Sequence, residues 1–177
     1  MLEINIYFCI SFSSPRLFYK RGNVNNKTMK PLNKLRIAVC NDHAGFELKS
    51  TILDHLKAIG VTKVKDFGSY TAERSDYPDY AHPLAIAVEK GEFDFGITIC
   101  GSGNGINMVA NKHKGIRSAL CWENEIASLA RRHNNANVIA LPARFVTANE
   151  AKEMVNTFLT TGFEGGRHQT RVDKIPC

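Results

Sequence analysis

Residues 94–111 read DFGITICGSGNGINMVAN, and this stretch decides the fold. It opens with an apolar, β-branched run that ends at Cys100. Glycine then fills alternate positions, at Gly101, Gly103 and Gly105, before an apolar segment with helical spacing. This order predicts a buried strand, a glycine turn and the start of a helix.

The glycine turn predicts an anion-binding concavity. Backbone without Cβ atoms can adopt positive φ angles, so several N–H groups can point at one ligand at the start of a helix. Cys100 lies on the rim of this turn, where we expect the local positive field to favour its thiolate. The alternative is a tight strand-to-helix connection whose cysteine is buried and inert.

Two nucleotide-binding motifs match this loop only in part. The Walker motif needs a lysine after its last glycine, and this loop has none. The dinucleotide motif G-x-G-x-x-G needs a later third glycine, although Glu123 and Glu125 follow at about the distance of a ribose-binding acid, roughly 20 residues on. A nucleotide-binding module without chemistry therefore stays open as a weaker hypothesis.

Composition bounds the class of protein. The chain has 177 residues, 44% hydrophobic and 23% charged, which fits one globular domain. Most of the net charge of +6 comes from residues 1–34, which hold six lysines and arginines against one glutamate. Since the rest of the chain is close to neutral, we expect no nucleic-acid-binding surface on the folded body.

Residues 1–34 are interpreted as a leader outside the fold. The apolar residues 2–12 are too few to span a bilayer, and no basic residue precedes them as a secretory signal requires. The leader is poor in acid and contains Ser and Arg, which a mitochondrial transit peptide also shows. We expect Met29, which KPLNK and the first strand follow, to be the natural start.

The cysteines predict the compartment. They are odd in number and lack CxxC spacing, so neither a disulfide framework nor a cysteine zinc site is indicated. A reducing compartment, the cytoplasm, is expected, and no membrane partner. The sequence indicates no role for Cys40, Cys121 and Cys177.

From residue 35 the chain alternates strands with helices. The predicted strands are 35–40, 61–67, 95–100, 116–120 and 137–141, and the predicted helices between and after them are 44–59, 81–90, 124–132 and 151–159. A capping box of Thr147 and Glu150 precedes the last helix. This predicts an α/β fold: a single three-layer Rossmann-like domain, with a five-stranded parallel sheet, helices on both faces and a site at the carboxyl ends of the strands.

Polar residues converge on that edge of the predicted sheet. Those that follow strand ends are Asp42, His43, Ser69, Tyr70, Asp76, Tyr77, Cys100, Ser102 and Arg144. Each alone has an ordinary explanation, such as a helix cap or a turn, but their convergence around an anion-ready turn and a thiol indicates a site. Two further clusters stand apart in sequence: His133 with Asn134 at a helix end, and Arg167, His168 and Arg171 in the tail. The tail arginines could grip a phosphate or form a solvated basic surface.

Six ordered motifs carry a family resemblance that covers about residues 35–172. They are NDHAGFELK (41–49), ERSDYPDYA (73–81), ICGSGNGI (99–106), ANKHKGIR (110–117), RRHNNANV (131–138) and EGGRHQTR (164–171). Together they resemble the type B ribose-5-phosphate isomerases, which belong to a wider family that includes the galactose-6-phosphate isomerase subunits.

The resemblance implies a metal-free and cofactor-free interconversion of ribose 5-phosphate and ribulose 5-phosphate, by ring opening and then proton transfer through an enediolate. It implies that Cys100 is the catalytic base, since Ile106 stands where some members carry a glutamate instead. Ser102, with the backbone amides of Gly101, Gly103 and Gly105, is expected to stabilise the enediolate oxygen. A hexose 6-phosphate isomerase, acting on allose or galactose 6-phosphate, is the alternative on the same scaffold.

The resemblance also implies roles for residues outside the loop. His133 is expected to assist ring opening with Asp42 near the ring oxygen, and Asn134 to lie beside the oxyanion. Further substrate-binding residues are Tyr77 and, as the phosphate grip, His43, Arg144, Arg167 and Arg171. The family builds each site across a subunit interface, so a homodimer or dimer of dimers is expected.

Overall fold

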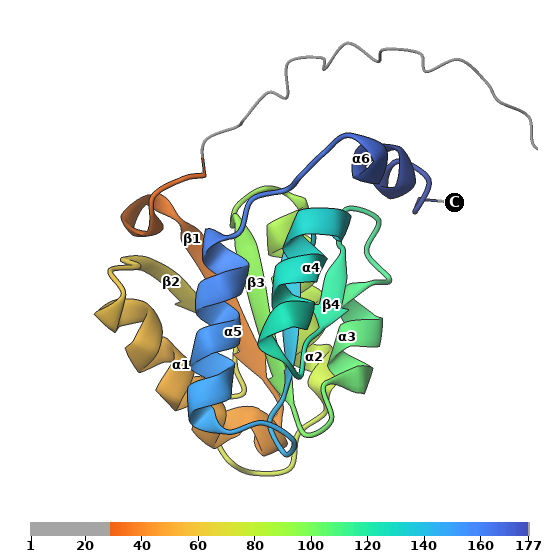
Figure 1. The fold of residues 1–177 in the computed structure, drawn as a ribbon. Helices are drawn as coiled ribbons and strands as arrows, with labels where there is room; N and C mark the ends of the chain where they lie inside the picture. The colour runs from red at the N-terminus through yellow and green to blue at the C-terminus, as the bar shows by residue number, and fades with distance from the viewer. Residues whose placement is uncertain (1–28, 177) are drawn as a thin grey trace, which may run out of the picture.

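Five parallel strands form the centre of the molecule, in the order β2-β1-β3-β5-β4 (Figure 1). A computed structural model describes residues 29–176 of the chain. The strands are β1 (Arg36–Asn41), β2 (Lys63–Asp66), β3 (Phe95–Cys100), β4 (Ser118–Leu120) and β5 (Val138–Pro142). The predicted parallel sheet is confirmed.

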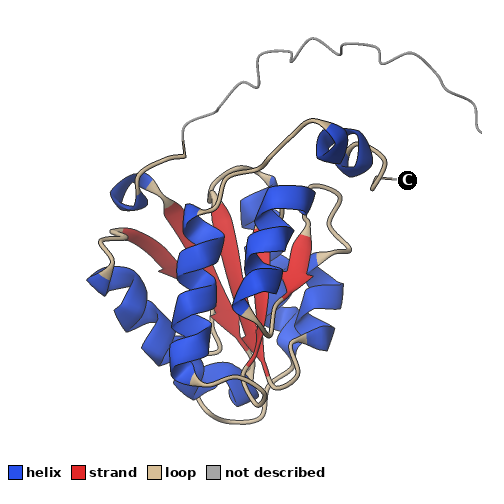
Figure 2. Ribbon diagram, viewed as in Figure 1, coloured by secondary structure: helices blue, strands red, loops and turns tan. Residues whose placement is uncertain are grey.

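Helices cover both faces of this sheet (Figure 2). They are α1 (Phe46–Ala58), α2 (Tyr77–Glu89), α3 (Asn104–Ala110), α4 (Asn124–Asn134), α5 (Ala148–Thr160) and α6 (Arg167–Val172), with the short 3₁₀ turns η1 (Leu32–Lys34) and η2 (His43–Gly45). None of the described helices is long and apolar enough to cross a membrane.

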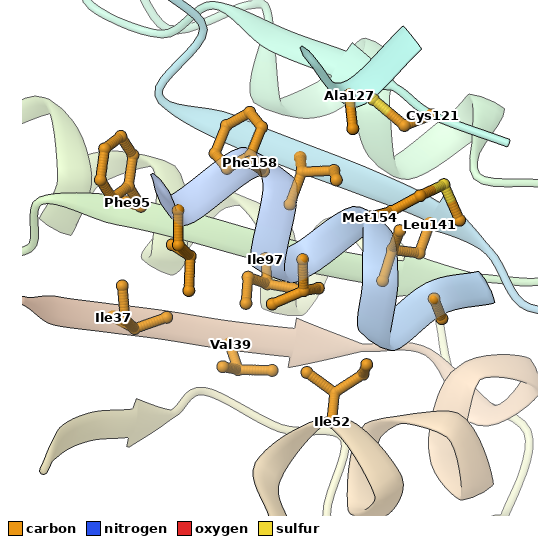
Figure 3. Close-up of a cluster of buried hydrophobic side chains, with 14 of the residues drawn as sticks. Ile37, Val39, Ile52, Phe95, Ile97, Cys121, Ala127, Leu141, Met154 and Phe158 are labelled. Carbon is orange, nitrogen blue, oxygen red and sulfur yellow. The ribbon is translucent and has the colours of Figure 1, made fainter. Parts of the chain in front are cut away.

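Two apolar cores, one on each face, bury the sheet. On the face that α1, α4 and α5 cover, Ile37, Ile97 and Leu141 pack against Met154 and Phe158 (Figure 3). On the other face, strand residues of the opposite parity pack against α2 and α3, and they include Ala38, Cys40 and Cys100. All six residues of β3 are buried, which fits a strand with paired neighbours and a core on both faces. The three-layer prediction is therefore confirmed.

Several predicted boundaries differ from the structure by one to four residues, and two of these differences have a clear cause. Strand β4 begins at Ser118 rather than at residue 116, because the backbone N–H groups before it bond elsewhere: Gly115 donates to Glu89 and Arg117 to the side chain of Asn137. Helix α2 begins at Tyr77, four residues before its predicted start. Pro78 stands in the first turn of α2. A proline is tolerated there, because a backbone N–H at that position would have no acceptor within the helix.

The C-terminus of α4 is held firmly in place. Asn135 adopts the left-handed conformation that ends the helix, with φ of 47°. The Arg117 guanidinium donates to the carbonyls of Asn134 and Asn135 at 2.8 to 3.1 Å. Arg131, which is buried, donates to Ala136 O and to Thr161 O. Residues 1–28 of the predicted leader, 1–34, lie outside the described residues. Residues 29–34 are described and contact the fold, since Lys30 bonds Asp94 and Leu32 packs against the core.

Candidate active site

The glycine loop after β3 forms around the sulfur of Cys100. This cysteine is 4% exposed, and the Gly103 N–H points at its Sγ atom across 3.2 Å. Gly103 has φ of 73°, and a Cβ atom there would lie 2.3 Å from Leu120 Cδ1. Conformation and space both require glycine at this position. The loop therefore brings backbone donors to a nearly enclosed thiol.

Burial controls the protonation of this thiol. Desolvation raises the pKa of Cys100 above its ordinary value of 9.0, and the nearby Asp42 carboxylate adds to the rise. The backbone N–H groups of Ile106, Gly103 and Ser102 act in the opposite direction and lower the pKa. The loop amides therefore favour the thiolate, as the sequence predicts, but burial outweighs them and the net pKa is raised.

Asp42 and His43 follow β1 and border the loop. The Asp42 Oδ1 atom caps η2 by accepting from the N–H groups of Ala44 and Gly45, at 2.9 and 3.2 Å. A Cβ atom on Gly45 would lie 2.6 Å from Ile99 O, so this turn packs directly on the end of β3. The His43 Nδ1 atom lies 3.2 Å from the Ser75 carbonyl oxygen, which ties the ring to the loop before α2.

Arg144 and Tyr77 also lie against the glycine loop. The Arg144 N–H donates to Gly101 O at 3.0 Å, and a Cβ atom on Gly101 would lie 3.3 Å from Arg144 Nε. A Cβ atom on Gly105 would lie 2.6 Å from the Tyr77 ring. Beside the loop opens a hollow of about 430 Å³, lined by Ser102, Asn104, Leu120, Trp122, Pro142 and Phe145. The predicted convergence at the carboxyl edge of the sheet is confirmed.

The other predicted site residues gather where α4 meets α6. The His133 and His168 rings are stacked, with centroids 4.1 Å apart and planes 3° apart. The Glu164 Oε2 atom lies 3.7 Å from His133 Nε2 and 3.6 Å from His168 Nε2, while its Oε1 accepts from Arg132 Nε at 2.6 Å. Sequence analysis missed Glu164, because it lies in an irregular segment whose contacts no periodicity predicts.

These two groups of residues lie at opposite edges of the sheet. The loops after β1, β3 and β5 lie at the carboxyl edge, whereas α6 and the end of α4 lie at the amino edge (Figure 1). One chain therefore brings Cys100, Asp42 and Arg144 together but keeps His133 and the tail arginines apart from them.

His133, Glu164 and His168 also form a candidate metal group, since their ligand atoms lie within 4.8 Å of one another. An imidazole binds a metal along its ring plane, and two parallel stacked planes cannot both point at one ion between them. Arg132, Arg167 and Arg171 add positive charge around the group. The arrangement suits a proton or an anion better than a cation.

Comparisons with known proteins identify the relatives of this chain. Residues 37–175 match the ribose/galactose isomerase family. Ribose-5-phosphate isomerase B of Escherichia coli is 49% identical over 140 residues, which cover 79% of this chain and 93% of that protein. The D-erythrulose-4-phosphate isomerase of Pectobacterium atrosepticum is 46% identical over 143 residues, covering 80% and 93%.

Solved structures agree with these relatives. The ribose 5-phosphate isomerase of Thermotoga maritima has a TM-score of 0.79 at 46% identity, over 81% of this chain and 98% of that one. Ribose-5-phosphate isomerase B of Mycoplasma genitalium, solved with bound ribulose-5-phosphate, has a TM-score of 0.77 at 46% identity, over 80% and 94%. Sequence, fold and the thiol-centred glycine loop together show that the chain belongs to the ribose/galactose isomerase family.

Proposed function

We propose that this protein interconverts ribose 5-phosphate and ribulose 5-phosphate. The observation that carries the proposal is the Cys100 thiol, held at the end of β3 by a glycine loop whose N–H groups point at its sulfur. A relative with the same fold is solved with ribulose-5-phosphate bound, and another carries the name ribose-5-phosphate isomerase B. An aldose–ketose isomerase needs one base beside C1 and C2 and donors for one oxyanion, and this loop offers both.

Cys100 would act as the base that moves a proton between C2 and C1. Its raised pKa leaves little thiolate at neutral pH in a lone chain. Positive charge from a second chain must therefore act together with the loop amides to favour the thiolate. The Ser102 hydroxyl and the amides of Gly101, Gly103 and Gly105 would stabilise the enediolate oxygen. Each well-placed donor contributes about 3 kcal/mol to the transition state.

The remaining residues would open and hold the substrate. His133 would assist ring opening with Asp42 near the ring oxygen, while Asn134 lies beside the oxyanion and Tyr77 lines the site. The phosphate would be held by His43, Arg144, Arg167 and Arg171. A grip on the remote phosphate fixes C1 and C2 against the sulfur, which lowers the entropy cost of the proton transfer.

Two copies would complete each site. A single substrate cannot touch both edges of one sheet, so the amino edge of one copy must meet the carboxyl edge of another, in a homodimer or a dimer of dimers. Two apolar side chains that line the hollow support this, since Trp122 is 55% and Phe145 73% exposed in one chain. The described cysteines are free thiols, which fits a reducing cytoplasm.

A substrate panel tests the proposal. Steady-state turnover would be compared for ribose 5-phosphate, allose 6-phosphate, galactose 6-phosphate and erythrulose 4-phosphate, with EDTA present. We expect ribose 5-phosphate to give the largest kcat/KM. A larger value for a hexose or tetrose phosphate would keep the scaffold and change the substrate. No turnover, with tight nucleotide binding by calorimetry, would favour the nucleotide-binding module.

The role of Cys100 has its own test. We expect Cys100→Ala to keep the fold and to lower kcat/KM by about 10²-fold or more, because the reaction loses its base. Cys121→Ala is the matched control, since Cys121 is also a buried free thiol. If Cys100→Ala kept more than about a tenth of the wild-type rate, the assignment of the base would be wrong.

A further inference from the structure

Glu164 holds the last turn of α4 and α6 together. Its backbone N–H donates to Arg132 O at 3.0 Å, and its Oε1 accepts from Arg132 Nε at 2.6 Å. These two bonds fix the carboxylate beside the end of α4. Its second oxygen, Oε2, then faces the Nε2 atoms of both His133 and His168 at 3.7 and 3.6 Å.

The two histidines differ in their surroundings. His168 is 5% exposed, and burial, followed by the charges of His133 and Arg167, lowers its pKa. Arg171 acts in the same direction, whereas Glu164 opposes it. The side chain of His133 is 33% exposed, and its Nδ1 has no hydrogen-bond partner among residues 29–176. His168 is therefore the buried ring of the stack, and His133 is the ring that a ligand can reach.

We propose that Glu164 and His168 are positioning residues that act on ring opening through His133. The Glu164 carboxylate lies 3.7 Å from Nε2 of His133, and the stacked His168 ring covers one face of the His133 ring. In this proposal the other nitrogen, Nδ1, is the one left for the substrate. This inference rests on the proposed function and deepens it.

The chemistry needs such an arrangement. When the cyclic aldose opens, the C1–O4 bond breaks, O4 gains a proton and the O1 hydroxyl loses one to give the aldehyde. An imidazole can move these protons only if its tautomer and orientation suit the sugar, and the partner of its other nitrogen sets both. A carboxylate on Nε2 favours the proton there and leaves Nδ1 as the acceptor.

Two measurements separate ring opening from proton transfer. Ribose 5-phosphate is a ring in solution and must open before it isomerises, so its net turnover needs both steps. Ribulose 5-phosphate cannot form a five-membered ring, because its O5 carries the phosphate, and in D₂O the exchange of its C1 hydrogen for deuterium needs only the proton transfer. A residue that acts through ring opening therefore matters for net isomerisation and little for this exchange. A residue that acts on the proton transfer or on the phosphate matters for both.

The experiment compares Glu164→Gln with wild type in both measurements. The matched control is Glu153→Gln, an exposed glutamate of α5. We expect Glu164→Gln to lower kcat/KM for the isomerisation of ribose 5-phosphate by roughly tenfold or more, and to change the rate of deuterium exchange at C1 of ribulose 5-phosphate by less than about twofold. Glu164→Asp, which keeps the charge, should recover part of the loss. Thermal unfolding of all variants checks that α6 stays docked.

Three outcomes overturn the proposal. If Glu164→Gln behaves like Glu153→Gln in both measurements, the carboxylate does not act through His133. An equal loss in both measurements would assign Glu164 to the proton transfer or to the phosphate instead. If wild type does not isomerise ribose 5-phosphate, the proposed function fails first and this inference with it.

Discussion

The two edges of the sheet carry different kinds of functional group. The carboxyl edge holds a buried thiol among backbone donors, and almost all of its geometry comes from tight packing of the loops after β1, β3 and β5. The amino edge holds exposed arginines, a carboxylate and two stacked imidazoles. Under the proposed function, the first edge serves proton transfer at carbon, and the second serves phosphate binding and proton transfer at oxygen. The separation of the two edges then means that a complete site needs two chains.

Mixing two defective chains tests this division most strongly. Cys100→Ala damages the carboxyl edge and Arg171→Ala the amino edge, so each variant alone should have little activity. In a mixed dimer, one of the two sites combines the intact carboxyl edge of one chain with the intact amino edge of the other. Random pairing makes about half of the dimers mixed, so about a quarter of the wild-type activity returns. Activity would be measured after the two variants are unfolded and refolded together.

The same mixture can contradict the division. If both edges served one site within a single chain, every site in the mixture would carry one defect and no activity would return. Two separately refolded samples, combined only in the assay, provide the control for exchange of subunits.

A glycine substitution should destabilise the carboxyl edge next most strongly. Gly103→Ala places a Cβ atom 2.3 Å from Leu120 Cδ1 at a φ of 73°, so strain and crowding add. We expect the free energy of unfolding to fall by about 3 kcal/mol, measured in urea. Gly60→Ala is the matched control, because Gly60 has φ of 86° but open space around it, and should cost about 1 kcal/mol. Equal losses would show that crowding contributes nothing.

The pH dependence reports the state of the thiol. Because burial raises the pKa of Cys100 above 9.0, kcat/KM for ribose 5-phosphate should rise by about tenfold per pH unit from pH 7 to pH 9. The sign follows because the base is the deprotonated form and a raised pKa moves its appearance to higher pH. A plateau that begins near pH 7 would show that charges from the second chain outweigh burial.

An acid at the amino edge should affect stability and leave the chemistry unchanged. Asp94 bonds Arg36 and Lys30, and although burial opposes it, these bonds lower its pKa from 3.8 to about 2. Asp94→Asn should lower the free energy of unfolding by about 1 kcal/mol at neutral pH. A lowered pKa means that this contribution is present above pH 3.8 and is lost as the pH falls towards 2.

Urea unfolding at pH 7 and pH 3 measures that contribution. Asp54→Asn, at an exposed position of α1, is the control. The assignment would be contradicted if Asp94→Asn and wild type differed by the same free energy of unfolding at both pH values. A change in kcat/KM would contradict it as well.

Local sequence predicted the carboxyl edge better than the amino edge. The strand, turn and helix around Cys100 are encoded within 94–111, and the parallel sheet brings Asp42 and Arg144 to the same loop. The sequence predicted the direction in which the loop amides act on Cys100 but not the net rise of its pKa, because that rise depends on how completely neighbouring elements bury the sulfur.

The amino edge depends on contacts between distant segments. The stack of His133 on His168 joins residues 35 apart, and Glu164 joins both through an irregular segment. Neither periodicity nor capping signals report such contacts. The early start of α2 was missed for a simpler reason, since apolar spacing outweighed the proline that marks its first turn.

The buried guanidinium of Arg131 links the end of α4 at the amino edge to the apolar core. It lies 4.7 Å from the centroid of the Phe95 ring and 5.5 Å from that of Phe158, and it bonds carbonyls beyond the ends of α4 and α5. The helix end that carries His133 can therefore fray only when the core beneath it opens. Its amide hydrogens should exchange with deuterium as slowly as those of the central strands, at the rate of global rather than local opening.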